Sequence, residues 1–264
     1  MNTALREGLV EIKAAIPTFA TSGLVERAGA IGRIAGDSYE YICGLLGFRP
    51  DIQLLVLSEA DWPSRTQTPI FGLPNASNGT LAVAGTETPF WAELAGMVDA
   101  ADQPELARVY GDGTSGGEIK LAPFFDLVAV HEVAHVFHEG SQHFPRLWLQ
   151  EFFANLCLQA WVAERRPEAL PTLLTLPRLG AKAPAEAFTY RSRDDFERLY
   201  SDVGGANYAW FQFRLQLAAA ALYDRAGAQA VTRLFEAFRL DDSALARRLE
   251  ESVDPGLAAF SLAF

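Results

Sequence analysis

The residues best suited to chemistry lie in the middle of the chain, where positions 131 to 135 read His-Glu-Val-Ala-His, an H-E-x-x-H pattern. In an α-helix, residues four apart differ by about 40° in direction and by about 6 Å along the axis. The imidazoles of His131 and His135 can therefore reach one zinc ion from the same helix face. Glu132 lies beside that face, where its carboxylate can hold a water molecule and take its proton. The motif thus predicts metal-assisted hydrolysis.

The segment around the motif favours the helix that the motif needs. A largely apolar run from Phe124 to Val130 precedes it, and neither glycine nor proline occurs between Phe124 and Glu139. Pro123 suits the first position of a helix, so we expect a helix from 123 to 138. The alternative is two ordinary surface histidines that flank a glutamate on an amphipathic helix, which does not account for so apolar a segment.

A catalytic zinc ion takes three protein ligands and keeps one position open, so the motif needs a third ligand. The candidates are His138, His143 and Glu151. His138 shares the face of His131 but lies about 10 Å farther along the axis, and His143 falls in the following turn. Glu151 falls among apolar positions of the next expected helix, 146–164. A charge in such surroundings costs free energy unless a nearby cation offsets that cost. We therefore expect one zinc ion per chain with Glu151 as third ligand; the alternative is a glutamate that only interacts with the helix dipole.

An H-E-x-x-H motif followed by a glutamate ligand on the next helix resembles the gluzincin pattern of zinc metallopeptidases, in the peptidase MA-like superfamily. Thermolysin-type and aminopeptidase-type enzymes share this pattern, and the phrase W-L-x-E-x-x-A, here Trp148 to Ala154, is also similar to the group. The resemblance implies three zinc ligands, His131, His135 and Glu151. It also implies Glu132 as general base, a zincin-like fold and a peptide or protein substrate.

The tetrahedral intermediate of peptide hydrolysis needs a hydrogen-bond donor besides the metal. All four histidines lie between positions 131 and 143, so a donor farther along the chain must be Tyr190, Tyr200, Tyr208 or a nearby arginine. Aminopeptidase-type gluzincins use a tyrosine past the glutamate helix, and Tyr208 is similar in position, at the start of an expected helix over 207–226. The resemblance therefore implies Tyr208 as a second catalytic residue; the alternative is an aromatic residue of the core.

Zinc-bound histidines usually donate their other ring N–H to an acceptor, so an acceptor is expected near the motif. The side-chain carbonyl of Asn155, one turn after Glu151, can supply it, although thermolysin-type enzymes carry an aspartate at the similar position. Asp126 is the alternative, but about 140° of helix rotation separates it from His131. A carboxylate in the first turn of the helix explains Asp126 more simply.

The remaining segments predict an α+β fold that is mainly helical, with a small N-terminal β-sheet packed on the active-site helix. Apolar residues recur at helical spacing near the N-terminus, which favours helices there: Leu5, Leu9, Ile12 and Ile16. A further helical stretch is expected over about 24–46. Short apolar runs at 52–57 and 80–85 are typical of buried strands. Residues 79–84 are the expected edge strand for an extended peptide, and helices are also expected at 228–238 and after Asp241.

These elements divide the chain into three parts that together form one expected catalytic unit. The parts are N-terminal helices, a small sheet with the H-E-x-x-H helix, and a helical subdomain with the glutamate ligand: residues 1–50, 51–145 and 146–264.

The composition excludes several classes of protein. The chain of 264 residues has 22 Lys and Arg against 33 Asp and Glu, a formal net charge of −11, whereas nucleic-acid binders are usually basic. A hydrophobic fraction of 50% with 21% charged residues is too apolar for a disordered protein. Two cysteines exclude a disulfide scaffold and a cysteine-based zinc cluster. No apolar stretch is long enough to span a membrane and no secretory signal begins the chain, so we expect a cytoplasmic protein without membrane partners.

The sequence therefore predicts a zinc-dependent metallohydrolase, most simply a metallopeptidase that cleaves peptide bonds with Glu132 as base. One alternative is a catalytically inactive, metallopeptidase-like binding or regulatory protein. Another is a helical interaction protein in which the motif arose by chance. The aminopeptidase signature G-x-M-E-N is absent, and cleavage of chain ends or of internal bonds stays open, as does the oligomeric state.

Overall fold

The computed structural model of the chain describes residues 3–111, 117–139 and 146–238. The chain forms two compact units. Unit 1 comprises Met1–Ala92 with Lys120–Gly140, and unit 2 comprises Glu93–Ile119 with Ser141–Phe264. Helices dominate the described residues, and a five-stranded sheet lies in the N-terminal half, which confirms the expected α+β class.

The sheet belongs to unit 1 and has the strand order β1-β2-β3-β5-β4. Its three inner strands run parallel to one another, and each outer strand pairs antiparallel with its neighbour. Every residue of β3 and β5 is buried, as expected for strands covered on both faces, and this explains their continuous apolar runs. The strand bounds, in chain order, are β1 Val10–Ile12, β2 Thr18–Ala20, β3 Gln53–Leu57, β4 Asn75–Ser77 and β5 Thr80–Ala84.

Two expectations about this part of the chain are wrong. The helical spacing near the N-terminus predicted a helix, but the chain forms a 3-10 turn over Thr3–Arg6 and then β1 and β2. Short strands depend on pairing with distant partners, and the pairing of Phe19 with Leu55 supplies that here. The expected edge strand is also misplaced, because β5 pairs on both sides and β4 forms the edge.

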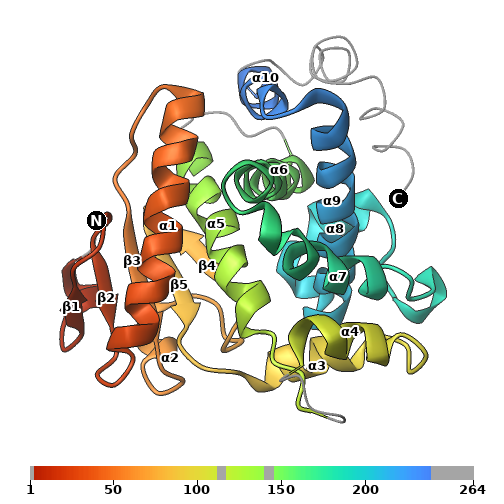
Figure 1. Cartoon of the computed structure of the whole chain (residues 1–264), viewed down its shortest axis with the longest axis horizontal. Helices are drawn as coiled ribbons and strands as arrows, with labels where there is room; N and C mark the ends of the chain where they lie inside the picture. Colours follow the sequence, from red (N-terminus) through yellow and green to blue (C-terminus); the bar gives the residue numbers. More distant parts are fainter. Residues whose placement is uncertain (1–2, 112–116, 140–145, 239–264) are drawn as a thin grey trace. The chain divides into compact units, whose positions relative to one another are not determined.

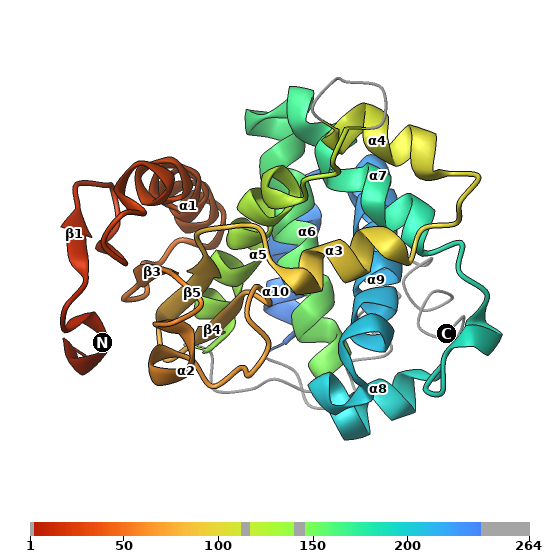
Figure 2. The same ribbon diagram turned by 90° about the horizontal axis from the view of Figure 1, so that it is seen from below.

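Two helices pack on one face of the sheet, α1 (Val25–Leu46) and α5 (Ala122–Glu139), as Figures 1 and 2 show. Both were expected, within two residues at each end. A Cβ on Gly36 of α1 would lie 2.8 Å from the Cβ of Ala15, so glycine permits this close approach of helix and chain. Arg27 of α1 forms an ion pair with Asp126 of α5, which joins the two helices.

The ends of α5 are fixed by contacts within unit 1. Near its start, the ring of Phe125 stacks on Trp91, with ring centroids 4.4 Å apart. At its end, the carboxylate of Glu139 accepts a hydrogen bond of 3.1 Å from the backbone N–H of Gly79, in the turn between β4 and β5. Gly79 has a φ of +73°, a conformation that favours glycine. These contacts fix the position of the H-E-x-x-H helix against the sheet.

Unit 2 is built around α6 (Leu147–Arg165), close to the expected 146–164. Its residues from Leu149 to Val162 are buried apart from Gln150, so α6 is a core helix apolar nearly all round. It packs against four helices that include the expected ones after residue 207: α7 Leu170–Gly180, α8 Arg193–Leu199, α9 Gly205–Ala226 and α10 Gln229–Ala237. Figure 1 shows α9 beside α6. The helix expected after Asp241 lies outside the described residues.

The remaining short elements complete the chain. In unit 2, α4 (Gln103–Tyr110) packs on α7, and the hydroxyl of Tyr110 donates a hydrogen bond to the carbonyl of Thr172. The other short helices and 3-10 turns are α2 Trp62–Arg65, α3 Pro89–Gly96, Pro167–Ala169, Ala185–Ala187 and Tyr200–Val203.

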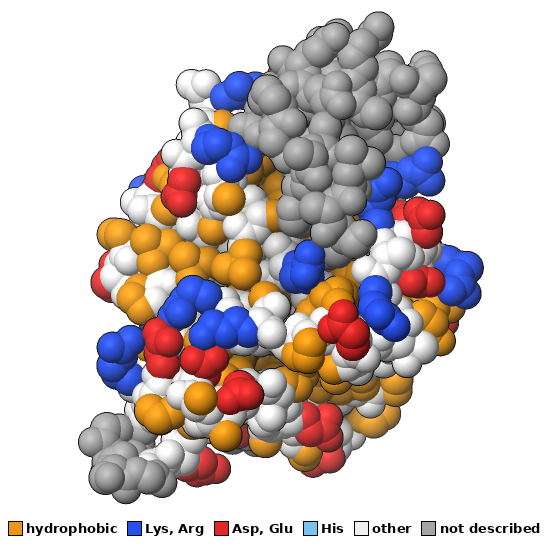
Figure 3. Space-filling model, turned by 90° about the vertical axis from the view of Figure 1, so that its right-hand side faces the viewer, with side chains coloured by type: hydrophobic (Ala, Val, Ile, Leu, Met, Phe, Trp, Pro, Cys, Tyr) orange, Lys and Arg blue, Asp and Glu red, His pale blue; other side chains and the backbone are white. Residues whose placement is uncertain are grey.

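Acidic and basic side chains are interspersed on the face that Figure 3 presents. Surface ion pairs in unit 2, such as Lys182 with Asp102 at 2.8 Å, follow this pattern. Exposed pairs of this kind contribute little to stability. Within the described ranges, none of the helices is both long enough and apolar enough to cross a membrane.

Candidate metal centre

The H-E-x-x-H motif lies on α5 of unit 1, and its three polar side chains are buried. The Nε2 atoms of His131 and His135 lie 2.9 Å apart, so the two rings meet through the nitrogens that commonly bind metals. Glu132 follows His131 directly and is also buried. The helix therefore presents the two histidines together, as the i, i+4 spacing predicted.

His138 has a different position from that of a metal ligand. Its Nε2 lies 2.5 Å from Nδ1 of His135, on the side of that ring opposite the contact with His131. In the tautomer that carries its proton on Nδ1, His135 donates to His138 and keeps the Nε2 lone pair for a metal. His138 is therefore positioned to accept from the Nδ1–H of a metal-bound His135. The other histidine considered as the third ligand, His143, lies outside the described residues.

Glu151 lies on α6 of unit 2 and has an exposed fraction of 0%. Both oxygens of its carboxylate accept hydrogen bonds within this unit. The hydroxyl of Tyr200 donates to Oε1 at 2.5 Å, and Nε2 of Gln212 donates to Oε2 at 2.6 Å. Burial, with the nearby Glu151 and Tyr208, raises the pKa of Tyr200 well above its usual value, so its hydroxyl keeps the proton that it donates.

The three tyrosines considered as oxyanion donors differ in their contacts. The Tyr200 proton points to Glu151, whereas the Tyr208 hydroxyl accepts a hydrogen bond of 2.8 Å from Gln212. That bond uses a lone pair of Tyr208 and not its proton. Tyr208 lies in the first turns of α9, where it was expected, with its ring centroid 5.7 Å from that of Tyr200. Tyr190 is held through its backbone, which exchanges two hydrogen bonds with the Asn207 side chain.

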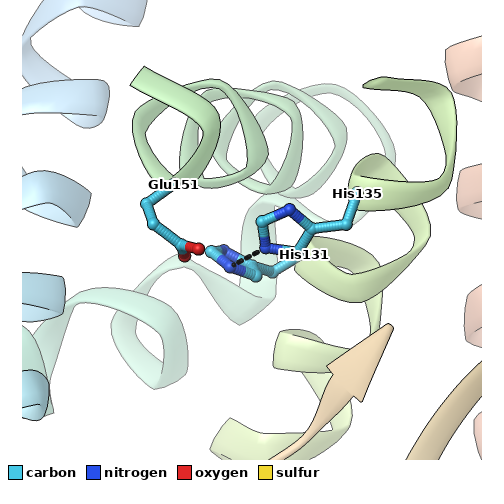
Figure 4. A group of neighbouring side chains, drawn as sticks. All are labelled: His131, His135 and Glu151. Atoms are coloured by element: carbon cyan, nitrogen blue, oxygen red, sulfur yellow. Dashed lines mark hydrogen bonds between the residues drawn. The ribbon is translucent and has the colours of Figure 1, made fainter. Parts of the chain in front are cut away.

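The three expected ligands form one group. Ligand atoms of His131, His135 and Glu151 all lie within 4.8 Å of one another, and Figure 4 shows the carboxylate and the two rings directed toward a common point. Two imidazole nitrogens and one carboxylate oxygen are a donor set that zinc accepts. A buried carboxylate also costs free energy unless hydrogen bonds or a cation offset it. The chemistry and burial of these residues therefore fit a metal ion.

Two further residues named from the sequence have other contacts. Asp126 pairs with Arg27, in agreement with its position on the opposite side of α5 from the histidines. The side-chain N–H of Asn155 donates to Oε1 of Gln212 at 3.0 Å. The role of Asn155 as an acceptor for a zinc-bound histidine remains a prediction.

Gln212 is the residue of the site that sequence reasoning missed, since it contacts Glu151, Tyr208 and Asn155. The available signal was its spacing, four residues after Tyr208 on a helix that is otherwise largely apolar. Its contact with Glu151 spans 61 positions and cannot be derived from spacing along one helix.

Comparison with known proteins adds no relative: no family model, no curated protein and no solved structure matches the chain.

Proposed function

We propose that the chain is a zinc-dependent metallohydrolase, and specifically a peptidase. The observation that carries the proposal is the buried group of His131, His135 and Glu151, whose ligand atoms lie within 4.8 Å of one another. Glu132, beside the first of these ligands, supplies the base that hydrolysis needs. Zinc is the proposed metal because a set of two histidines and one glutamate, with an open position, is typical of catalytic zinc.

The metal and the chain have separate tasks in this proposal. Zn²⁺, when bound, supplies a Lewis acid that polarises the scissile carbonyl and makes a water molecule more acidic. Glu132 takes the proton from the attacking water and passes it to the leaving amine. The hydroxyl of Tyr208, in the first turns of α9, is the proposed donor to the developing oxyanion. His138 holds His135 in the tautomer that faces the metal.

The proposed substrate is a peptide or protein in an extended conformation. An extended peptide can add to the exposed edge of a sheet through backbone hydrogen bonds. In unit 1 the edge strand beside α5 is β4 (Asn75–Ser77), and α5 packs directly against it. We therefore propose β4, in place of the expected 79–84, as the strand that receives the substrate.

The test is hydrolysis of a mixed peptide library by the zinc-loaded protein, followed by mass spectrometry of the products. We expect cleavage by the wild type and its loss in Glu132→Gln, a variant that keeps shape and removes the base. Zinc binding without cleavage of any peptide would contradict the peptidase and favour the non-catalytic alternative. Equal cleavage by wild type and Glu132→Gln would show that the activity comes from a contaminant or from another site.

A further inference from the structure

A row of polar side chains runs along the contact between α6 and α9 in unit 2, where the surrounding positions are mostly apolar. Residues four apart lie on the same face of a helix. Each helix contributes three residues at this spacing: Glu151, Asn155 and Gln159 from α6, and Tyr208, Gln212 and Gln216 from α9. We refer to these six residues as the polar row.

Hydrogen bonds cross between the helices along the polar row. Gln216 Nε2 donates to Gln159 Oε1 at 3.1 Å, and Asn155 Nδ2 donates to Gln212 Oε1 at 3.0 Å. Gln212 Nε2 then donates to Glu151 Oε2 at 2.6 Å. These bonds join successive turns of the two helices, and the one from Gln212 reaches Glu151.

The polar row is not the arrangement that packing alone would favour. Asn155, Gln159 and Gln216 are each 5% exposed or less. A buried amide costs free energy unless its hydrogen bonds are made, and apolar side chains at these positions would carry no such cost. The amides add a fixed orientation of the bonded groups, because hydrogen bonds constrain distance and angle whereas apolar contacts do not. At Glu151 this orientation comes from Gln212, because its side chain donates to the carboxylate itself.

A second segment holds the other oxygen of Glu151. Tyr200 donates to Oε1 from a residue whose φ is +50°, a value that non-glycine residues rarely adopt. Such conformations persist where the surrounding structure imposes them, and they are common at functional sites. An ionised carboxylate has about four acceptor positions, so the bonds from Tyr200 and Gln212 do not exhaust its capacity to bind a cation.

We infer that Tyr200 and Gln212 are positioning residues that hold the Glu151 carboxylate in the orientation in which it binds the metal. The inference rests on the proposed function, because it presumes a metal ion at Glu151. It goes beyond that function by assigning two residues that do not bind the metal themselves. Partners of this kind usually change metal affinity by about tenfold to hundredfold when they are removed.

The experiment compares zinc dissociation constants, measured by competition with a chelating dye, for the wild type, Tyr200→Phe, Gln212→Met and Gln216→Met. Phenylalanine and methionine keep the shape of the replaced side chains and remove only their hydrogen-bonding groups. Gln216→Met is the matched control, because it deletes the same amide one turn farther along α9, where the partner is Gln159 and not Glu151. Urea unfolding of the metal-free proteins and the visible spectra of their Co²⁺ forms are recorded in parallel.

We expect Tyr200→Phe and Gln212→Met each to weaken zinc binding by about tenfold or more and to alter the Co²⁺ spectrum. Gln216→Met should lower the urea midpoint and leave zinc affinity and spectrum as in the wild type. Wild-type affinity in both site variants would overturn the inference alone, and so would an equal loss in all three variants, which would indicate general packing. A wild type that binds no zinc would overturn the proposed function itself.

Discussion

The hydroxyl of Tyr200 donates to Oε1 of Glu151 at 2.5 Å, although 49 positions separate the two residues and Tyr200 has a positive φ. A strained backbone that places a protonated phenol on a fully buried carboxylate indicates a site in which the direction of that carboxylate matters. The same carboxylate lies with His131 and His135 in the candidate metal centre. The hydrogen bond from Tyr200 therefore acts on one of the three proposed metal ligands.

Tyr208 and Tyr200 should differ in what their hydroxyl groups contribute. Tyr208→Phe removes the proposed oxyanion donor, so we expect kcat on a cleaved peptide to fall by about 10² or more. Zinc affinity should stay close to that of the wild type, in contrast to Tyr200→Phe. Steady-state kinetics together with the dye competition assay check this pair. An unchanged kcat in Tyr208→Phe would remove Tyr208 from the catalytic residues.

His138 should affect metal binding through His135 and without contacting the metal. His138→Phe removes the nitrogen that lies 2.5 Å from His135 Nδ1 and keeps a flat ring. We expect a loss of about tenfold to hundredfold in zinc affinity with stoichiometry kept at one per chain, because the ligand is less well oriented but still present. Titration calorimetry measures both quantities. Full retention of affinity would show that His135 has another partner of equal effect.

Asp126 should make the stability of the protein depend on pH. Burial raises the pKa of Asp126 above its usual value, an effect that the neighbouring Arg27 opposes without cancelling. The folded protein thus holds this proton more tightly than the unfolded chain, and this stabilisation is complete only below the unfolded pKa of about 3.9. It is lost as the pH rises through the raised folded pKa.

Urea unfolding at a series of pH values from about 4 upward tests this sign. Relative to the wild type, Asp126→Asn should show a smaller decrease in unfolding free energy as the pH rises. Asp51→Asn, which removes an exposed carboxyl of the same unit, is the control. Parallel profiles for wild type and Asp126→Asn would contradict the assignment.

Two glycines of α1 should respond in opposite directions to alanine. The Cβ of Gly36→Ala would lie 2.8 Å from the Cβ of Ala15, and such overpacking usually costs about 1–3 kcal/mol. Gly44 is exposed and has no atom within 4 Å of an added Cβ, so Gly44→Ala should stabilise the helix by about 0.5–1 kcal/mol. Urea midpoints of the two variants provide the comparison. A destabilised Gly44→Ala would show that α1 tolerates alanine poorly for another reason.

The sequence predicted the parts of the structure whose signals are local. The helix that carries His131 and His135 was predictable because an apolar run, Pro123 and the i, i+4 motif all indicate the same element. The helix with Glu151 was predictable because apolar residues surround this charged residue in the sequence. In both cases, local pattern and tertiary packing favour the same conformation.

Other features depend on partners far along the chain. Ile12 belongs to the apolar residues that recur at helical spacing near the N-terminus, but it lies in β1, where it pairs with Thr18 of β2. Thr80–Ala84 was identified as a strand, yet its place inside the sheet depends on β4, whose polar sequence, Asn75-Ala76-Ser77, is typical of a turn. The Gln212 contact likewise required the packing of α9 on α6, which no spacing within one helix reveals.

We propose that His131, His135 and Glu151 bind one zinc ion. The most direct test is the metal content of the purified protein after zinc supply and removal of excess, for the wild type and Glu151→Ala. We expect about one zinc per wild-type chain and a large loss in the variant, because a catalytic site needs three protein ligands. A wild type that retains no zinc, or a variant that retains as much as the wild type, would contradict it.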